Sequence, residues 1–141
     1  MRLSSLAAAR AAYYDRNATS VFLSYSASLG PHATATTRWT YTVPSGKKLL
    51  IEYTASRLWR QTVATAVNQY ATENYVTNGT NTATISARYS YDNTTTVIND
   101  DIRSCNLTLY PGEIVYASTV DNSTGGTVYY QTSAKGTLYD A

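Results

Sequence analysis

The sequence has few of the residues from which catalytic and metal sites are built. Its 141 residues include one His, one Cys and nine Asp and Glu residues. Catalytic triads, zinc sites and general acid–base pairs each require several such side chains to converge in space. We therefore expect no enzyme activity, and we expect no metal ion or other cofactor.

The isolated candidates have ordinary explanations. His32 follows a Gly-Pro turn and has no second His or Cys to complete a zinc set, so we expect an exposed loop histidine. Asp100 and Asp101 would point to opposite faces of a strand, and no calcium-binding loop flanks them, so we expect a solvated loop. Gly125-Gly126 is not followed by Lys-Ser, which favours a hairpin turn over a phosphate-binding loop.

Disulfides, strong charge and long apolar runs are also missing. Cys105 is the single cysteine, which excludes an intrachain disulfide and favours a buried, inert thiol. Charged residues make up 14% of the chain, the net charge is +2 and the basic residues are scattered, so nucleic acid is not an expected partner. No apolar run approaches the roughly 18 residues of a membrane span, and the apolar stretch near the start ends at Arg10, too early for a secretion signal.

The chain is rich in residues that favour β-strands. It has 14 Tyr and 2 Trp against one Phe and one Met, and Thr is abundant throughout. Aromatic and β-branched side chains favour the pleated, half-buried surface of a sheet. A hydrophobic fraction of 43% provides enough apolar area for a folded core.

Alternating apolar and polar residues, separated by turn residues, predict the strands. They are expected at residues 20–28, 36–43, 47–60, 83–91, 102–109, 114–120 and 127–139, with shorter extended segments at 75–76 and 95–98. Asn78-Gly79 is the strongest hairpin signal, and residues 121–126 are expected to close a last hairpin. In the third strand we expect Leu49, Ile51, Tyr53 and Ala55 to share one face.

Two segments do not read as strands. Residues 61–74 place Val63, Val67 and Tyr70 at helical spacing but are rich in Thr and Asn, so a short helix and a loop leading to a strand both remain open. Residues 1–18 contain helix-forming Ala, Leu and Arg without capping residues, and we expect an N-terminal arm with one or two helical turns. Such an arm either frays or orders on a neighbouring subunit.

The fold class follows from the spacing of strands and turns. Many short strands at intervals of about 8–14 residues, with almost no helix, favour an all-β fold. We expect an antiparallel β-sandwich or jelly roll of about eight strands. Residues 19–141 would form this single domain, and residues 1–18 the arm.

The surface composition favours contact with other proteins. Trp and Arg are the side chains most often found as interface anchors, and Arg57, Trp59 and Arg60 bring both together near the end of the longest expected strand. In the alternative arrangement, Trp59 lies in the core and the two arginines extend outward. A second candidate contact is the arm, through its large apolar and aromatic side chains Leu3, Leu6, Tyr13 and Tyr14.

Two segments carry a resemblance to a known family. Residues 41–51 read Tyr-Thr-Val-Pro-Ser-Gly-Lys-Lys-Leu-Leu-Ile, and residues 107–117 read Leu-Thr-Leu-Tyr-Pro-Gly-Glu-Ile-Val-Tyr-Ala. In these segments the chain resembles small jelly-roll structural proteins of tailed bacteriophages. The resemblance implies a capsid decoration (cement) protein, synthesised in the host cytoplasm and typically a homotrimer, that binds the major capsid protein on the outside of the virion. No functional motif carries over residue by residue.

Other functions are compatible with the same composition. In a carbohydrate-binding β-sandwich, Trp59 and several tyrosines would form a stacking platform for a sugar ligand. A phage tail or fibre accessory protein would share the fold and differ in its partner. Five glycosylation sequons, at Asn17, Asn78, Asn93, Asn106 and Asn122, are expected by chance in a chain so rich in Asn and Thr.

Overall fold

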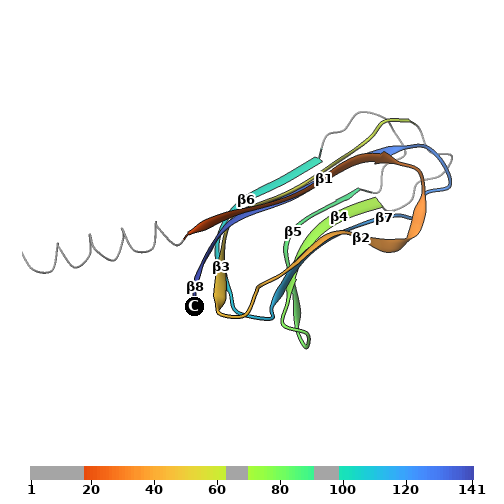
Figure 1. Ribbon diagram of the computed structural model, residues 1–141. Helices are drawn as coiled ribbons and strands as arrows, with labels where there is room; N and C mark the ends of the chain where they lie inside the picture. The colour runs from red at the N-terminus through yellow and green to blue at the C-terminus, as the bar shows by residue number, and fades with distance from the viewer. Residues whose placement is uncertain (1–17, 63–69, 91–98) are drawn as a thin grey trace, which may run out of the picture.

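The computed structural model describes residues 18–62, 70–90 and 99–141, which form eight β-strands in two layers (Figure 1). The strands are β1 (Thr19–Leu29), β2 (His32–Thr42), β3 (Lys47–Arg60), β4 (Tyr70–Thr77), β5 (Thr82–Ser90), β6 (Asn99–Leu109), β7 (Ile114–Asp121) and β8 (Val128–Asp140). The N-terminal arm expected at residues 1–18 lies, apart from Ala18, outside the described residues.

The strands pair in a nested order. β1 pairs with β8, β2 with β7, β3 with β6 and β4 with β5, all antiparallel. Two further antiparallel pairings, β3 with β8 and β4 with β7, join these into the four-stranded sheets β1-β8-β3-β6 and β2-β7-β4-β5. A long hairpin rolled up into two packed sheets in this way is a jelly roll. The expected fold class is therefore confirmed.

Most strands lie where the alternation places them. β3 has the predicted bounds, and the Asn-Gly turn joins the paired strands β4 and β5, with Gly79 at φ 90°. Residues 121–126 do not close a hairpin, because β7 and β8 belong to different sheets. Of the open segment 61–74, residues 70–74 belong to β4 and residues 63–69 lie outside the described residues, as does the expected extended segment at 95–98.

A bulge in β3 changes which side chains face the second sheet. Ile51 lies opposite Gly136 and Tyr53 opposite Lys135, so Glu52 is an extra residue between consecutive partners on β8. Leu49 and Ile51 are buried between the sheets, as expected, but Tyr53 is displaced to the outer face. An extra residue reverses the alternation beyond it. The inward positions are therefore Thr54, Ser56, Leu58 and Arg60.

The interior consists of two apolar clusters with a polar layer between them. The larger cluster contains Val43, Leu49, Ile51, Leu109 and Val115, and the smaller contains Leu58, Tyr70, Val128 and Tyr130. Between them Asn74 donates to the carbonyl of Ala55 (2.9 Å) and to the hydroxyls of Ser56 (3.2 Å) and Ser86 (2.8 Å), and it accepts from Thr132. Asn74 therefore connects β3, β4, β5 and β8 across both sheets.

The close packing of β8 on β3 predicts a strong effect at Gly136. A Cβ atom at this position would lie 2.5 Å from the carbonyl oxygen of Leu50, a contact with backbone that cannot move aside alone. We expect Gly136→Ala to lower the free energy of unfolding by about 1–3 kcal/mol, measured by urea denaturation. Gly30→Ala is the matched control, because a Cβ at Gly30 meets nothing within 4 Å; equal stability of the two variants would contradict this packing.

The polar layer predicts a large cost for removing the Asn74 amide. Asn74→Ala leaves the hydroxyls of Ser56, Ser86 and Thr132 without this partner in a buried site, and we expect a loss of roughly 2–4 kcal/mol in unfolding free energy. Asn106→Ala on the exposed part of β6 should change stability by less than about 0.5 kcal/mol. The two melting curves, recorded side by side, test whether Asn74 holds the sheets together.

Candidate functional site

The predicted interface residues of β3 are separated by the pleat of the strand. Arg57 faces outward and forms a two-point ion pair with Asp100 of β6, with Nε to Oδ1 at 2.8 Å and Nη2 to Oδ2 at 3.0 Å. Trp59 also faces outward and stacks on Tyr129 of β8, with ring centroids 4.0 Å apart at 28°. Cross-strand aromatic pairs such as Trp59–Tyr129 stabilise a sheet. The Arg57–Asp100 ion pair and the Trp59–Tyr129 stack are both partly exposed.

Arg60 lies on the opposite side of the same strand and is 0% exposed. Its guanidinium carbon lies 4.5 Å from the centroid of Tyr70, between the two sheets. The structure therefore matches neither expected arrangement, because Trp59 is outside the core and Arg60 does not extend outward. The remaining predicted interface residues, Leu3, Leu6, Tyr13 and Tyr14, lie outside the described residues.

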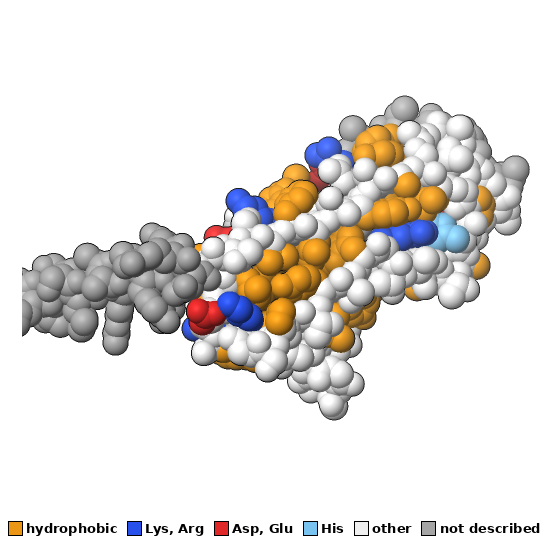
Figure 2. Space-filling model, viewed as in Figure 1, with side chains coloured by type: hydrophobic (Ala, Val, Ile, Leu, Met, Phe, Trp, Pro, Cys, Tyr) orange, Lys and Arg blue, Asp and Glu red, His pale blue; other side chains and the backbone are white. Residues whose placement is uncertain are grey.

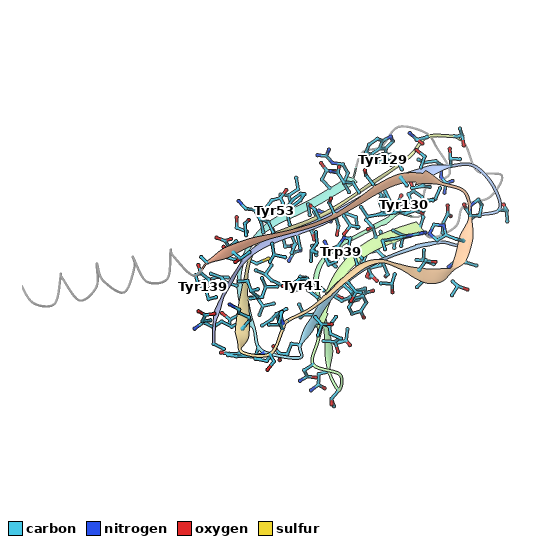
Figure 3. The ribbon with its side chains drawn as sticks, in the orientation of Figure 1. Trp39, Tyr41, Tyr53, Tyr129, Tyr130 and Tyr139 are labelled. Carbon is cyan, nitrogen blue, oxygen red and sulfur yellow. The ribbon has the colours of Figure 1, made fainter. Side chains whose placement is uncertain are left out.

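Trp59 and Arg57 belong to a larger surface, which we call the outer face. It is the solvent-facing side of the β1-β8-β3-β6 sheet, where Tyr53 and Tyr129 project away from the second sheet (Figure 3). Phe22 on β1 is 66% exposed and Ile102 on β6 is 53% exposed. On the same face, a small cavity of about 80 Å³ is lined by Tyr53, Ala55, Arg57, Ile102, Gln131 and Ser133.

A second apolar surface lies along one side of the sandwich, between the edge strands β1 and β2. Figure 2 shows it as a band of hydrophobic side chains, and Figure 3 shows Trp39 and Tyr41 lying between the sheets. We call it the apolar side and define it by Val21, Leu23, Tyr25, Trp39 and Tyr41, all half-buried. Inward residues of the central strands, such as Leu49 and Val115, are almost fully buried, so the core is open along this side.

Polar side chains bound the apolar side at one end. Arg38 lies 5.1 Å over the Tyr25 ring and donates to the Thr119 hydroxyl at 2.8 Å. His32 was expected in an exposed loop, but it begins β2 and is half-buried, with ring nitrogens 2.9 Å from the Gly30 carbonyl and from Thr119. A cross-strand partner far along the chain holds the ring in place, which a local turn pattern does not reveal.

The opposite side of the sandwich, between β5 and β6, is closed by charged side chains. Asp101 accepts from the Ala87 backbone N–H at 3.0 Å and from Arg103 at 2.8 Å, and Arg88 donates to the Asp100 carbonyl. Burial raises the pKa of Asp101, but these donors outweigh it and hold the pKa below its usual value. Asp100 and Asp101 therefore lie on a strand with their side chains on opposite faces, and not in the expected solvated loop.

Other kinds of site were sought in the described part of the chain. Residues 18–62, 70–90 and 99–141 contain no group of three His, Cys, Asp or Glu side chains placed to hold a metal ion. Within the same residues there is no helix of the length and hydrophobicity needed to cross a membrane. Cys105 is half-buried, with its sulfur 3.6 Å from the Thr54 hydroxyl. The two apolar surfaces are thus the main candidate sites.

Comparison with known proteins yields no family. No family model matches the sequence. No curated protein matches it either.

Similar folds occur among solved structures. A structure of infectious bursal disease virus, Gx strain, has a TM-score of 0.44 at 12% identity and covers 91% of this chain and 33% of the viral chain. The VP2 subviral particle of the same virus gives 0.43 at 14%, covering 90% and 34%. A Bacillus endospore appendage, described as a disulfide-linked pilus, gives 0.43 at 11%, covering 87% and 89%. The chain spans about a third of the viral chains, and these likenesses are confined to the fold.

The outer face predicts a change in surface hydrophobicity without a change in fold. Phe22→Ser combined with Ile102→Ser removes two exposed apolar side chains, so we expect the unfolding free energy to fall by less than about 1 kcal/mol. Retention on a hydrophobic-interaction column should drop measurably. Unchanged retention of the double variant would show that these side chains are not accessible in solution.

Proposed function

We propose that this protein is a non-enzymatic structural protein that works by binding other protein surfaces. The open apolar side is the observation that carries the proposal. Val21, Leu23 and Tyr41 pack against the core, yet they are only half-buried. A contiguous apolar surface on a folded domain marks a site of association.

The edges of the apolar side favour a protein partner. β1 pairs only with β8 and β2 only with β7 among the described strands, so each has one edge of backbone N–H and C=O groups without a strand partner. An extended segment can add to such an edge. The Trp39 indole N–H is buried and has no acceptor in the described chain.

Within this class, we propose a capsid decoration (cement) protein. The resemblance at residues 41–51 and 107–117 supports it, and both segments form strand, Pro-Gly turn and strand: β2 to β3 and β6 to β7. Low charge also suits the role, because close-packed copies on a lattice repel one another little. In this proposal the chain is a homotrimer on the outer surface of the virion, bound to the major capsid protein and not to nucleic acid.

The first test is the mass of the purified protein by light scattering over a concentration series, followed by binding to capsids that lack it. A trimer that binds such capsids and raises their resistance to heat supports decoration. A protein that stays monomeric and binds no particle would contradict it. A trimer that binds tails or fibres instead of heads would identify the accessory protein and reject the cement role.

The two tryptophans report which surface is covered. Trp59→Phe leaves Trp39 on the apolar side as the single tryptophan, and Trp39→Phe leaves Trp59 on the outer face. If association uses the apolar side, acrylamide quenching of Trp39 should fall severalfold on binding while quenching of Trp59 stays constant. The reverse pattern would assign binding to the outer face. Association with neither reporter protected would contradict both surfaces.

The Trp59–Tyr129 stack favours a second candidate, a carbohydrate-binding module. Aromatic faces bind the apolar faces of sugar rings, and Arg57, Asp100 and Gln131 lie close by with polar groups able to bind hydroxyls. A glycan screen followed by Trp59→Ala tests this reading. Binding that is lost in Trp59→Ala but kept in Trp39→Phe would favour it, and a blank screen would remove it.

A further inference from the structure

Three buried side chains at one end of the interior each carry at least one polar atom without a hydrogen-bond partner. Arg60, Thr72 and Asp121 are each 0% exposed. The atoms without a partner are Nε and Nη2 of Arg60, Oγ1 of Thr72 and Oδ2 of Asp121. A buried polar atom without a partner costs free energy, and a buried charge without a partner costs much more. These atoms therefore require partners that the described chain does not itself supply.

The three side chains belong to one small region. The Arg60 guanidinium lies over the Tyr70 ring, and Tyr70 is directly opposite Asp121 across the β4–β7 pairing. Directly opposite residues have Cβ atoms about 4.5–5.5 Å apart. Thr72 is the next inward residue on β4 after Tyr70, and it is the diagonal neighbour of Asp121. Burial and the charge of Asp121 both raise the pKa of the Tyr130 hydroxyl, which places that charge close to Tyr130 as well.

The loop between β7 and β8 holds the two charged groups in place. Arg60 Nη1 donates to the Gly125 carbonyl at 3.2 Å, and Asp121 Oδ1 accepts from the Ser123 backbone N–H at 2.8 Å. The Ser123 hydroxyl in turn donates to the Gly125 carbonyl at 3.1 Å. One atom of each charged side chain is thus bonded to the loop of residues 122–127. The remaining polar atoms of both side chains are free to bind something else.

Arg60 and Asp121 do not bind each other directly. The ion pairs among the described residues are Lys47–Asp140, Arg57–Asp100 and Arg103–Asp101. A single partner shared by the two side chains would have to accept from a guanidinium and also donate to a carboxylate. A bound anion would be repelled by Asp121 and a bound cation by Arg60, whereas water both accepts and donates. A molecule of water also satisfies the Thr72 hydroxyl.

We propose that Arg60 and Asp121 form a buried ion pair bridged by bound water, with Thr72 as the third anchor. The site lies next to the loop of residues 122–127 and connects β3, β4 and β7. It is an internal binding site for water, and it goes beyond the proposed role in association. The bridge compensates two charges that would otherwise be buried without a counterpart.

A double-mutant cycle tests the pairing. Arg60→Met and Asp121→Asn each leave the other charge buried alone, so each should raise the equilibrium constant of unfolding roughly a hundredfold or more. The double variant should be much more stable than the product of the two single effects implies. Independent effects that simply multiply would overturn the pairing.

Oxygen-17 magnetic relaxation dispersion tests the water itself, because it detects water molecules held inside a protein far longer than surface water. The wild-type chain should show such a contribution, and Arg60→Met with Asp121→Asn should reduce it. Thr72→Val keeps volume and charge, so it folds even if the charge variants do not, and it should reduce the contribution or shorten the residence time. No change in Thr72→Val and in the double variant would overturn the bridge.

The Arg57–Asp100 pair on the outer face provides a matched control. It joins the same two residue types by direct hydrogen bonds and is partly exposed. Arg57→Met with Asp100→Asn should leave the long-lived water signal unchanged and alter stability only slightly. An equal loss of signal in this control would show that the change reflects general loosening of the fold, and it would overturn the assignment.

Discussion

The amide of Asn74 connects the two sheets at the level where the interior is polar. Sandwiches are usually joined by apolar side chains that interdigitate between the sheets. Here the apolar contacts form two separate clusters, and between them Thr54, Ser56, Ser86 and Thr132 face inward. Hydroxyls buried in this way are tolerated only if they are hydrogen-bonded. A single side chain with two donors and an acceptor, placed on a central strand, satisfies most of them at once.

This polar layer also explains which parts of the fold were predictable from sequence. Where inward residues are apolar, as in β1 and in β3 before Glu52, alternation placed the strands within a residue of their observed bounds. In β4 the inward residues include Thr72 and Asn74, so alternation of hydrophobicity is absent and residues 70–74 did not read as a strand. The strand there pairs with β5 and β7, and the Asn74 side chain binds residues of β3 and β8 that are distant in the sequence.

The outer face and the apolar side were less predictable from sequence, because they depend on how strands that are distant in the sequence pair with one another. Trp59 and Arg57 were found from residue type alone, but the side each residue faces is set by the bulge at Glu52 and by the close approach of Gly136 on β8. The apolar side was missed entirely. The alternation of Val21, Leu23 and Tyr25 indicates a half-buried strand, yet only the strand order shows that β1 and β2 are both edges and that the core opens between them.

The edge strands on the two sides of the sandwich differ in their charge and in the hydrogen bonding of their backbone groups. Between β5 and β6, Asp101 accepts from the Ala87 N–H, and Arg88 donates to the Asp100 carbonyl of β6. These two backbone groups are occupied, and the charges discourage a further strand. Between β1 and β2, the outward positions carry mostly serines and threonines, and the inward positions carry the half-exposed aromatic side chains Tyr25, Trp39 and Tyr41. On the apolar side, charged side chains lie at the two ends of the hydrophobic band and leave its middle uncharged (Figure 2). The sandwich is closed by charged side chains between β5 and β6 and is open between β1 and β2. This arrangement is expected of a surface that binds a partner.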